Sequence, residues 1–325
     1  MPVPWIVTIT ATFLAVSGSA LDARELTIDS IDNAEFPTQK AKGIEPGVIK
    51  AQVLLDRLRF SPGMIDGTGG ENFRKAVTAF QHSRQLSESG RLDRQTWDKL
   101  GQTAEGPTAA EYTISDADVR GPFVQSIPHK MEEMAKLKGL YYTSPIELLS
   151  EKFHIDEKLL KALNPDKSLS KAGETILVTN VERPDEKGLA AKVEVDKKLK
   201  MVRALDKGGA LLAIYPASIG SEEKPAPSGS FKVRAVKDNP TYHYNPEFNF
   251  KDVKSKTPFT IPPGPNNPVG SVWIDLSLPS YGIHGTPEPA KVSKTYSHGC
   301  IRLTNWDARD LANLVTKGIP VDFID

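Results

Sequence analysis

One cysteine and two histidines are the residues of this sequence best able to do covalent chemistry. Cys300 is the only cysteine among 325 residues, and His284 and His298 precede it in the runs Ile-His-Gly-Thr and Ser-His-Gly-Cys. A free thiol is only a few per cent thiolate at neutral pH, and an imidazole within hydrogen-bond reach can accept its proton. The composition of this segment therefore favours a nucleophile with its base over a buried, inert thiol.

The spacing around Cys300 also predicts how its neighbours are presented. If residues 297–303 are extended, His298, Cys300 and Arg302 share one face, while Ile301 and Leu303 point into the core. Acyl transfer through the thiol would need donors for an oxyanion, and the backbone N–H groups near Gly299 and Cys300 are the natural candidates.

A metal site is the competing interpretation of His284, His298 and Cys300, because three such ligands would leave a catalytic position open on zinc. Their spacing matches no Cys-x-x-Cys or His-Glu-x-x-His pattern, so we expect no metal. We expect no nucleotide or other cofactor either, since no glycine-rich phosphate loop is present. His243, in an insertion between strands, is the one other histidine that we weigh as a lining residue of the cleft. The rest are expected to be structural: His82, His129 and His154.

Charge balance excludes one class of partner. The chain has 41 basic and 41 acidic residues and no basic cluster, so nucleic acid is not an expected partner. Its length leaves room for one or two smaller modules beside a catalytic region.

The elements that position the reactive residues can be predicted from pattern. Alternation predicts a strand at 272–276, before His284. Thr304 has the character of a helix cap, with Asp307 at the third position, and Gly318 marks the end of that helix. Val321 and Phe323 suggest a closing strand.

The two histidine-containing runs resemble the signature of L,D-transpeptidase (YkuD) catalytic domains, and the likeness extends over about residues 190–325. The resemblance implies a mainly β, sandwich-like catalytic domain in a multidomain α+β chain. It implies that Cys300 is the nucleophile, His284 the general base, and His298 a neighbour that shapes the pocket. It also implies a substrate site that contains Arg302, which would meet a carboxylate, with Gly285, Ser297 and Gly299.

Such enzymes attack the third residue of a peptidoglycan tetrapeptide stem, release the terminal D-alanine and pass the acyl group to an amine. The expected partners are therefore peptidoglycan stem peptides and glycan strands, with carbapenems as covalent inhibitors of Cys300. Two alternatives stay open. Water could resolve the same thioester, giving a carboxypeptidase or an amidase, or the chain could be a non-catalytic wall-binding protein.

Residues 1–23 have the form of a secretory signal peptide, with an apolar stretch that ends in small residues. The stretch is short for a membrane span, yet it has no Lys or Arg before it, so an uncleaved anchor is an alternative. We expect a periplasmic or otherwise extracytoplasmic protein.

Three short helices are predicted over residues 45–101, with apolar stripes such as Phe73, Val77 and Phe80. With Ile65-Asp-Gly67, Phe80-Gln81, Gly90, Leu92 and Thr96-Trp97, the segment resembles a peptidoglycan-binding domain of the three-helix type. Phe80 and Trp97 could equally be core residues of a small bundle. A calcium loop at 66–71 is discounted because it lacks alternating acidic ligands.

A linker is expected at 102–138, followed by a second module at 139–181. There Ser144 and Glu147 form a capping box with Pro145 at the first helical position, and Asp156 caps a second helix. Two short helices between strands resemble a LysM module, which binds glycans. The usual Gly-Asp turn is replaced by Thr-Ser-Pro at 143–145, so no glycan contacts are assigned.

Overall fold

The computed structural model describes residues 26–37, 43–103, 106–183, 186–221, 224–248, 253–295 and 299–325. The expected signal segment at 1–23 and two expected site residues, Ser297 and His298, lie outside these ranges. Within them, none of the helices combines the length and the apolar character that crossing a membrane requires.

The first module is helical, as predicted. After a short helix α1, three helices pack around one core; the four helices are α1 (Ile28–Asp32), α2 (Pro46–Arg57), α3 (Glu71–Ser83) and α4 (Arg94–Thr103). Helix α2 is buried on two sides. Its Leu54 and Leu55 join the core of this module, whereas Ile49 and Val53 join the core of the next one. The two modules therefore share a helix rather than a flexible connection.

The second module is a pair of antiparallel strands that encloses short helices. The elements are β1 (Ala109–Thr113), α5 (Asp116–Arg120), α6 (Met131–Met134), α7 (Pro145–Lys152), α8 (Glu157–Leu163) and β2 (Thr175–Thr179). The predicted caps are present, because the side chain of Ser144 accepts from the N–H of Glu147 and that of Asp156 accepts from the N–H of Lys158.

The stretch expected to be a linker at 102–138 differs from that expectation. Ala109 pairs with Thr179 and Thr113 with Thr175, so β1 is the first strand of the second module. The pairing joins residues about sixty positions apart, and a five-residue strand with few β-branched residues gives little local signal.

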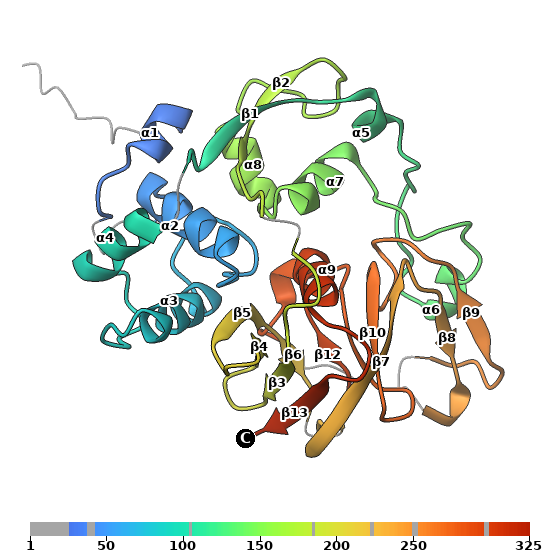
Figure 1. Cartoon of the computed structure of the whole chain (residues 1–325). Helices are drawn as coiled ribbons and strands as arrows, with labels where there is room; N and C mark the ends of the chain where they lie inside the picture. Colours follow the sequence, from blue (N-terminus) through green and yellow to red (C-terminus); the bar gives the residue numbers. More distant parts are fainter. Residues whose placement is uncertain are drawn as a thin grey trace, which may run out of the picture.

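The region expected to be catalytic is built on one sheet of nine strands in the described part of the chain, in the order β5-β4-β3-β13-β7-β10-β11-β12-β6 (Figure 1). Its strands are β3 (Lys192–Asp196), β4 (Met201–Leu205), β5 (Leu211–Pro216), β6 (Ser218–Ile219), β7 (Gly229–Asp238), β10 (Val272–Leu276), β11 (Gly282–His284), β12 (Ile301–Arg302) and β13 (Pro320–Ile324). Strands β5 and β6 stand at opposite ends of this order but are separated in sequence only by Ala217. The sheet must therefore curl until its two ends nearly meet.

This architecture confirms a mainly β domain and refines the expected sandwich, since a single curled sheet replaces two separate ones. Strand β10 has the predicted alternation of buried and partly buried residues. Val321 and Phe323 lie on a strand, as expected, but β13 does not close the sheet, because it runs between β3 and β7. Helix α9 (Asn305–Leu314) begins at the predicted cap, where Thr304 accepts from the N–H of Asp307.

A separate hairpin of β8 (Tyr242–Tyr244) and β9 (Phe259–Ile261) lies beside the sheet at the right of Figure 1. Two single turns of 3-10 helix complete the region, at Pro246–Phe248 and Pro289–Lys291. Helix α6 contacts this hairpin, because a carboxylate oxygen of Glu132 accepts from the N–H groups of Lys254 and Ser255.

Residues 59–65 of the first module contact both the second module and the nine-stranded sheet. The N–H of Ser61 donates to the carbonyl of Ile214 at 3.0 Å, and the N–H of Ile214 donates to Arg59, so this segment covers the edge strand β5. Four residues later, Ile65 exchanges hydrogen bonds with His154 and Asp156 of the second module. An edge strand that is paired in this way cannot add a further strand.

A buried ionic cluster lies at the same junction. The guanidinium of Arg183 contacts Asp310 at 2.8 Å, Asp56 at 2.9 Å and Asp307 at 3.9 Å. Asp56 belongs to α2, whereas Asp307 and Asp310 belong to α9. Removing one partner from a buried ion cluster is strongly destabilising, so these contacts fix the first module against the catalytic region.

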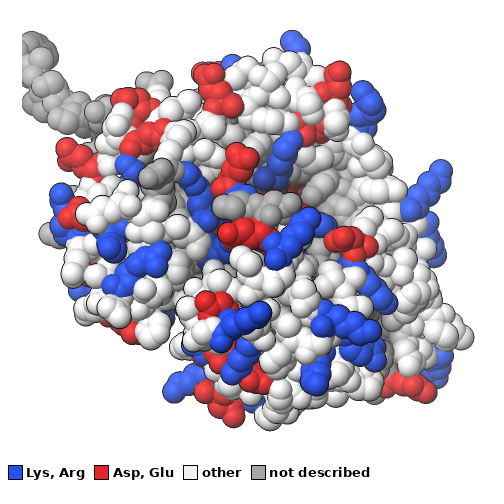
Figure 2. Space-filling view, in the orientation of Figure 1, with Lys and Arg blue, Asp and Glu red and all other residues white. Residues whose placement is uncertain are grey.

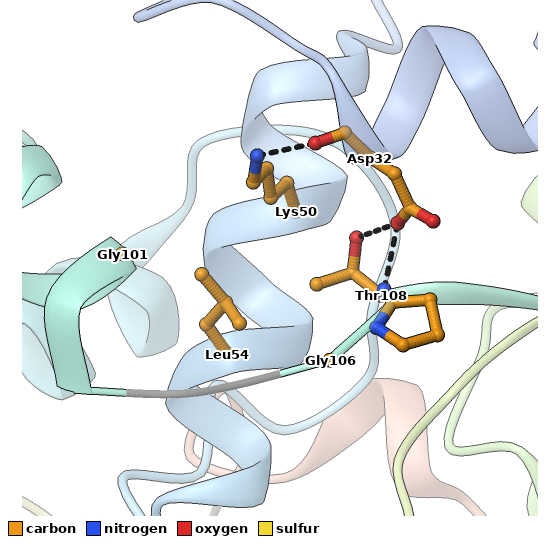
Figure 3. A pocket seen from close by; sticks show the side chains of 7 residues that line it. Asp32, Lys50, Leu54, Gly101, Gly106 and Thr108 are labelled. Atoms are coloured by element: carbon orange, nitrogen blue, oxygen red, sulfur yellow. Dashed lines mark hydrogen bonds between the residues drawn. The ribbon is translucent and has the colours of Figure 1, made fainter.

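The surface carries no obvious single-sign face in the view of Figure 2, where Lys and Arg are interspersed with Asp and Glu. A cavity of about 410 Å³ lies where α1 and α2 meet the chain before β1. Figure 3 shows Lys50 pointing to the carbonyl of Asp32, whose carboxylate accepts from the N–H and hydroxyl of Thr108. These polar groups already bond to one another. We therefore interpret the cavity as part of the junction between the first and second modules.

Candidate active site

Two adjacent parallel strands bring three of the expected site residues together. In the register of β11 and β12, Ile283 pairs with Ile301 and His284 with Arg302. Both isoleucines are buried in the main core, so His284 and Arg302 lie on the other face of the sheet. Cys300 comes immediately before β12, level with Gly282. The register of the two strands therefore brings Cys300, His284 and Arg302 close together.

His284 is held as a neutral imidazole of one tautomer. Its Nδ1 lies 2.6 Å from the carbonyl oxygen of Gly285 and must donate to it, so Nε2 carries the lone pair. The ring is 4% exposed and stacks on the indole of Trp273, with centroids 5.5 Å apart and planes 18° apart. Burial and the charge of Arg302 together lower the pKa of His284 to about 3, against the opposing bond to Gly285. At neutral pH the ring can therefore accept a proton at Nε2.

Cys300 is partly buried, with Sγ 3.9 Å from the carbonyl oxygen of Ser280. Burial raises the pKa of the thiol, while the N–H of Gly282 and the charge of Arg302 act in the opposite direction. The sulfur is consequently a thiol rather than a thiolate at neutral pH. It needs a base to become a nucleophile.

The peptide between Gly299 and Cys300 is oriented by a tyrosine. The hydroxyl of Tyr281 donates to the carbonyl oxygen of Gly299. In a trans peptide the C=O and the following N–H point in opposite directions, so the N–H of Cys300 points away from Tyr281. Gly299 has a φ of 123°, a conformation that a side chain would strain, which explains a glycine at this position. Burial also raises the pKa of Tyr281, which keeps its hydroxyl protonated as a donor.

Arg302 places a positive charge at the same face. Its Nε is buried and has no hydrogen-bond partner among the residues that the structure describes. Burial lowers the pKa of this guanidinium, and the charges of Glu288 and Cys300 oppose that effect. A buried guanidinium with an unused donor suits an anionic ligand.

The hairpin near the site presents a tyrosine rather than the histidine that the sequence suggested. His243 is exposed, and its ring nitrogens contact the hydroxyls of Thr241 and Thr260. Its neighbour Tyr242 is half-buried, and burial raises the pKa of Tyr242 to about 12, with a further contribution from the charge of Cys300. Because successive side chains of a strand alternate, Tyr242 lies on the opposite face of β8 from the exposed His243, and it is near enough to Cys300 for the charge of Cys300 to affect it.

The loop between His284 and Cys300 is held by the first module. Lys75 of α3 donates to the hydroxyl of Ser293 at 2.8 Å, and Asn72 donates to the carbonyl of Val292 at 3.2 Å. The N–H of Ser293 donates to Ser218 of β6. This part of the active-site loop therefore depends on side chains from another domain.

Of the remaining expected residues, Gly285 is buried and its carbonyl faces the His284 ring. Ser297 and His298 lie outside the described residues. The alternative metal site includes His298 as a ligand, so this alternative also concerns residues outside the described ranges. Within the described ranges, no group of three His, Cys, Asp or Glu side chains is placed to hold a metal ion.

Sequence reasoning missed Trp273 and Tyr242 as neighbours of the site. Trp273 lies on a strand that the sequence predicts, but the sequence does not predict which residue it pairs with. In the antiparallel pairing of β10 and β11, Trp273 lies opposite His284. Tyr242 could have been found by considering which residues share a face on either side of His243.

Comparison with protein families matches two parts of the chain. Residues 190–322 match the model of the L,D-transpeptidase catalytic domain, YkuD, and residues 45–100 match a model described as "Putative peptidoglycan binding domain". These matches confirm the two expected domains. Neither of these two matched ranges includes residues 139–181, which the sequence likens to a LysM module.

The chain is also similar to individual proteins. It is 26% identical over 187 residues to the "Putative L,D-transpeptidase YkuD" of Bacillus licheniformis, covering 56% of this chain and 96% of that protein. The protein of the same name from Bacillus subtilis is 29% identical over 170 residues, covering 52% and 87%. L,D-transpeptidase 3 from Mycobacterium tuberculosis, solved with a faropenem-derived adduct, has a TM-score of 0.35 at 17% identity, covering 47% of this chain and 75% of that one. The sequence match of residues 190–322 and the similarity to the Bacillus proteins support an acyltransferase enzyme.

Proposed function

We propose that this protein is a peptidoglycan L,D-transpeptidase that transfers a stem-peptide acyl group through Cys300. The observation that carries the proposal is the convergence of Cys300, His284 and Arg302 on neighbouring strands, inside a region that matches the L,D-transpeptidase catalytic domain. Transpeptidase chemistry needs a nucleophile, a base and a site for the anionic stem, and these three residues have those properties.

His284 acts as a general base in this proposal. The proton of the Cys300 thiol passes to Nε2 of His284 as sulfur bonds to the carbonyl carbon of the third stem residue. That residue's amide bond to the terminal D-alanine then breaks, and the imidazolium gives its proton to the leaving amine. A second amine attacks the thioester, restores the thiol and forms the new amide. A positioned base typically contributes about 10²- to 10⁴-fold to such a rate.

Charge develops on the carbonyl oxygen during both steps. The N–H of Cys300, oriented through the bond from Tyr281 to Gly299, is the proposed donor for that oxyanion. Arg302 is the proposed contact for a carboxylate of the substrate, supported by its buried Nε, which has no hydrogen-bond partner in the described part of the chain. His298, Ser297, Gly299 and Gly285 complete the proposed site.

The two N-terminal modules would hold the enzyme on its polymeric substrate. The match of 45–100 supports peptidoglycan binding by the first module. For the second module we propose a LysM-like role in glycan binding, supported by the two capped helices α7 and α8 that lie between the paired strands β1 and β2. Since peptidoglycan lies outside the cytoplasm, we propose an extracytoplasmic location with residues 1–23 as the signal.

The experiment that tests this function is product analysis by mass spectrometry. The purified protein and Cys300→Ala are incubated with a disaccharide-tetrapeptide muropeptide and a free D-amino acid. Crosslinked dimer or a tetrapeptide with an exchanged terminal residue, formed only by the native protein, supports the proposal. Tripeptide alone would show hydrolysis and contradict transfer, and an unchanged muropeptide would contradict activity on this donor.

A further inference from the structure

We infer that Glu151, in helix α7 of the second module, is a positioning residue for His284 and acts through Asn305 and Gly285. The inference rests on the proposed role of His284 as general base. It makes the second module part of the catalytic architecture, beyond any function in binding the wall.

The first step is the contact between Glu151 and Asn305. The Nδ2 of Asn305 lies 3.1 Å and 2.9 Å from the two carboxylate oxygens of Glu151, and the hydroxyl of Tyr142 donates to the same carboxylate at 2.8 Å. Asn305 is buried at the start of α9, three residues after Arg302. The contact therefore crosses from the second module to the segment that follows the reactive thiol.

The second step is that Glu151 decides which way the Asn305 amide points. An amide has a donor end and an acceptor end of nearly equal size. Glu151 and the carbonyl of Pro265 are both acceptors, and both face Nδ2. The oxygen must then face the opposite side, where it accepts from the N–H of Ser271 at 3.0 Å. Without Glu151, only the carbonyl of Pro265 and the N–H of Ser271 hold this orientation, so the preference for it is weakened.

The third step is the packing of that oxygen against two glycines. A methyl group added to either Gly285 or Gly270 would overlap Oδ1 of Asn305. The backbone of Gly285 therefore rests directly on the Asn305 amide. The N–H of Gly285 donates to Val272 at 3.2 Å, and its carbonyl accepts from Nδ1 of His284.

The last step joins this packing to the chemistry. The bond from Nδ1 to Gly285 keeps the proton on Nδ1, so that Nε2 can act as the base. If the Asn305 amide turns, its NH₂ group meets the N–H of Ser271 and the Gly285 backbone must shift. The imidazole would then divide between two tautomers, only one of which can take the thiol proton.

The test uses three variants of the full chain and two readouts. Glu151→Ala removes the carboxylate. Glu151→Gln keeps a carbonyl oxygen that can accept from Asn305. Asn164→Ala is the control, because Asn164 bonds only within the second module in the described structure, to Leu160 and Leu177, and its loss weakens that module without touching Asn305. The readouts are kcat and KM for transfer, and the imidazole nitrogen signals of His284 by ¹⁵N NMR.

We expect Glu151→Ala to lower kcat by about 10²-fold with KM within about threefold, the size of effect that a small misplacement of a catalytic group produces. The His284 signals should move from a pure Nδ1–H pattern toward a mixture, and Glu151→Gln should restore both. Asn164→Ala should lower the melting temperature without moving the His284 signals. An unchanged tautomer in Glu151→Ala, or the same tautomer change in Asn164→Ala, would overturn the inference. Because the NMR readout needs no turnover, failure of the proposed function and failure of this inference are distinguishable.

Discussion

Lys75 and Ser293 join the first module to the loop between the two reactive residues. The ammonium of Lys75 donates to the Ser293 hydroxyl at 2.8 Å, and burial lowers the pKa of Lys75 although Glu71 lies 3.1 Å away. The side chain of Lys75 is 7% exposed, so this bond lies in the interface rather than on its rim. A domain matched as peptidoglycan-binding thus contacts the proposed active site directly.

Replacing Lys75 with methionine should loosen this loop. The hydroxyl of Ser293 would lose its donor, at a cost of about 1–3 kcal/mol for an unsatisfied buried group. We expect faster amide hydrogen exchange over residues 286–295 and a transfer rate lowered about tenfold, if the loop must be ordered for reaction. Arg74→Met is the matched control, since Arg74 lies on the same helix but is exposed. Equal effects of the two substitutions would contradict a specific clamp.

The pH dependence follows from two shifted groups. Burial and the charge of Arg302 lower the pKa of His284 to about 3, so the ring stays neutral, with Nε2 unprotonated, at any pH above about 4. The pKa of the Cys300 thiol is raised, so the thiolate forms only at alkaline pH. We expect alkylation of Cys300 by iodoacetamide to rise with a midpoint above about 8.5, the value of an ordinary thiol.

Alkylation should be followed by intact mass over pH 5 to 10, with free cysteine as reference. A midpoint below that of free cysteine would show a thiolate–imidazolium pair formed in advance, which is contrary to a general-base mechanism.

Tyr281→Phe removes only the hydroxyl that holds Gly299. Because the aromatic ring remains packed against Phe323, the fold should be little changed. The peptide before Cys300 becomes free to turn, and its N–H is the proposed oxyanion donor. We expect a loss of about 10²- to 10³-fold in kcat, comparable to removal of one oxyanion donor, with KM nearly constant. Steady-state kinetics with a stem tetrapeptide measures this, and a change confined to KM would argue against the assignment.

Asp307→Asn tests the ionic cluster at the module junction. Burial raises the pKa of Asp307 to about 7, although Arg183 lowers it, and Asp56 adds to the rise. In the unfolded chain the carboxyl has an ordinary pKa near 4. Between these values the folded state binds the extra proton, so the stability that this group contributes is present below pH 4 and is lost as pH rises through 7.

Asparagine does not titrate, so Asp307→Asn should not lose stability through this position as the pH rises. We expect the melting temperature of Asp307→Asn, relative to that of the native protein, to increase as the pH rises from 4 to about 7.5, as followed by circular dichroism. A constant difference between the two proteins over this range would contradict a raised pKa. Asp322→Asn provides a control, because Asp322 is partly exposed and its pKa is lowered.

The local parts of the fold could be predicted from the sequence. The caps at Thr304 and Asp156, the strand at 272–276 and the three helices of the first module follow from short-range patterns, and the structure has them. The convergence of His284 and Cys300 was predictable because each lies beside a strand in a recognisable run.

The contacts between modules were not predictable in the same way. The pairing of β1 with β2, the Arg183 cluster and the bond from Glu151 to Asn305 all join residues that are distant in sequence. Each depends on register and on the final packing of separate cores, which no local periodicity records. Tyr242 was not predicted for a simpler reason, because the titratable side chain of its neighbour His243 was the more obvious candidate for this strand.

The measurement that tests the central proposal most directly is the intact mass of the protein after brief mixing with a tetrapeptide donor in the absence of an acceptor amine. The account predicts an adduct of the donor minus D-alanine, located on the peptide that contains Cys300 and absent from Cys300→Ala. A carbapenem should form an adduct on the same residue. An adduct of equal yield on Cys300→Ala, or donor turnover by that variant at the native rate, would contradict acyl transfer through Cys300.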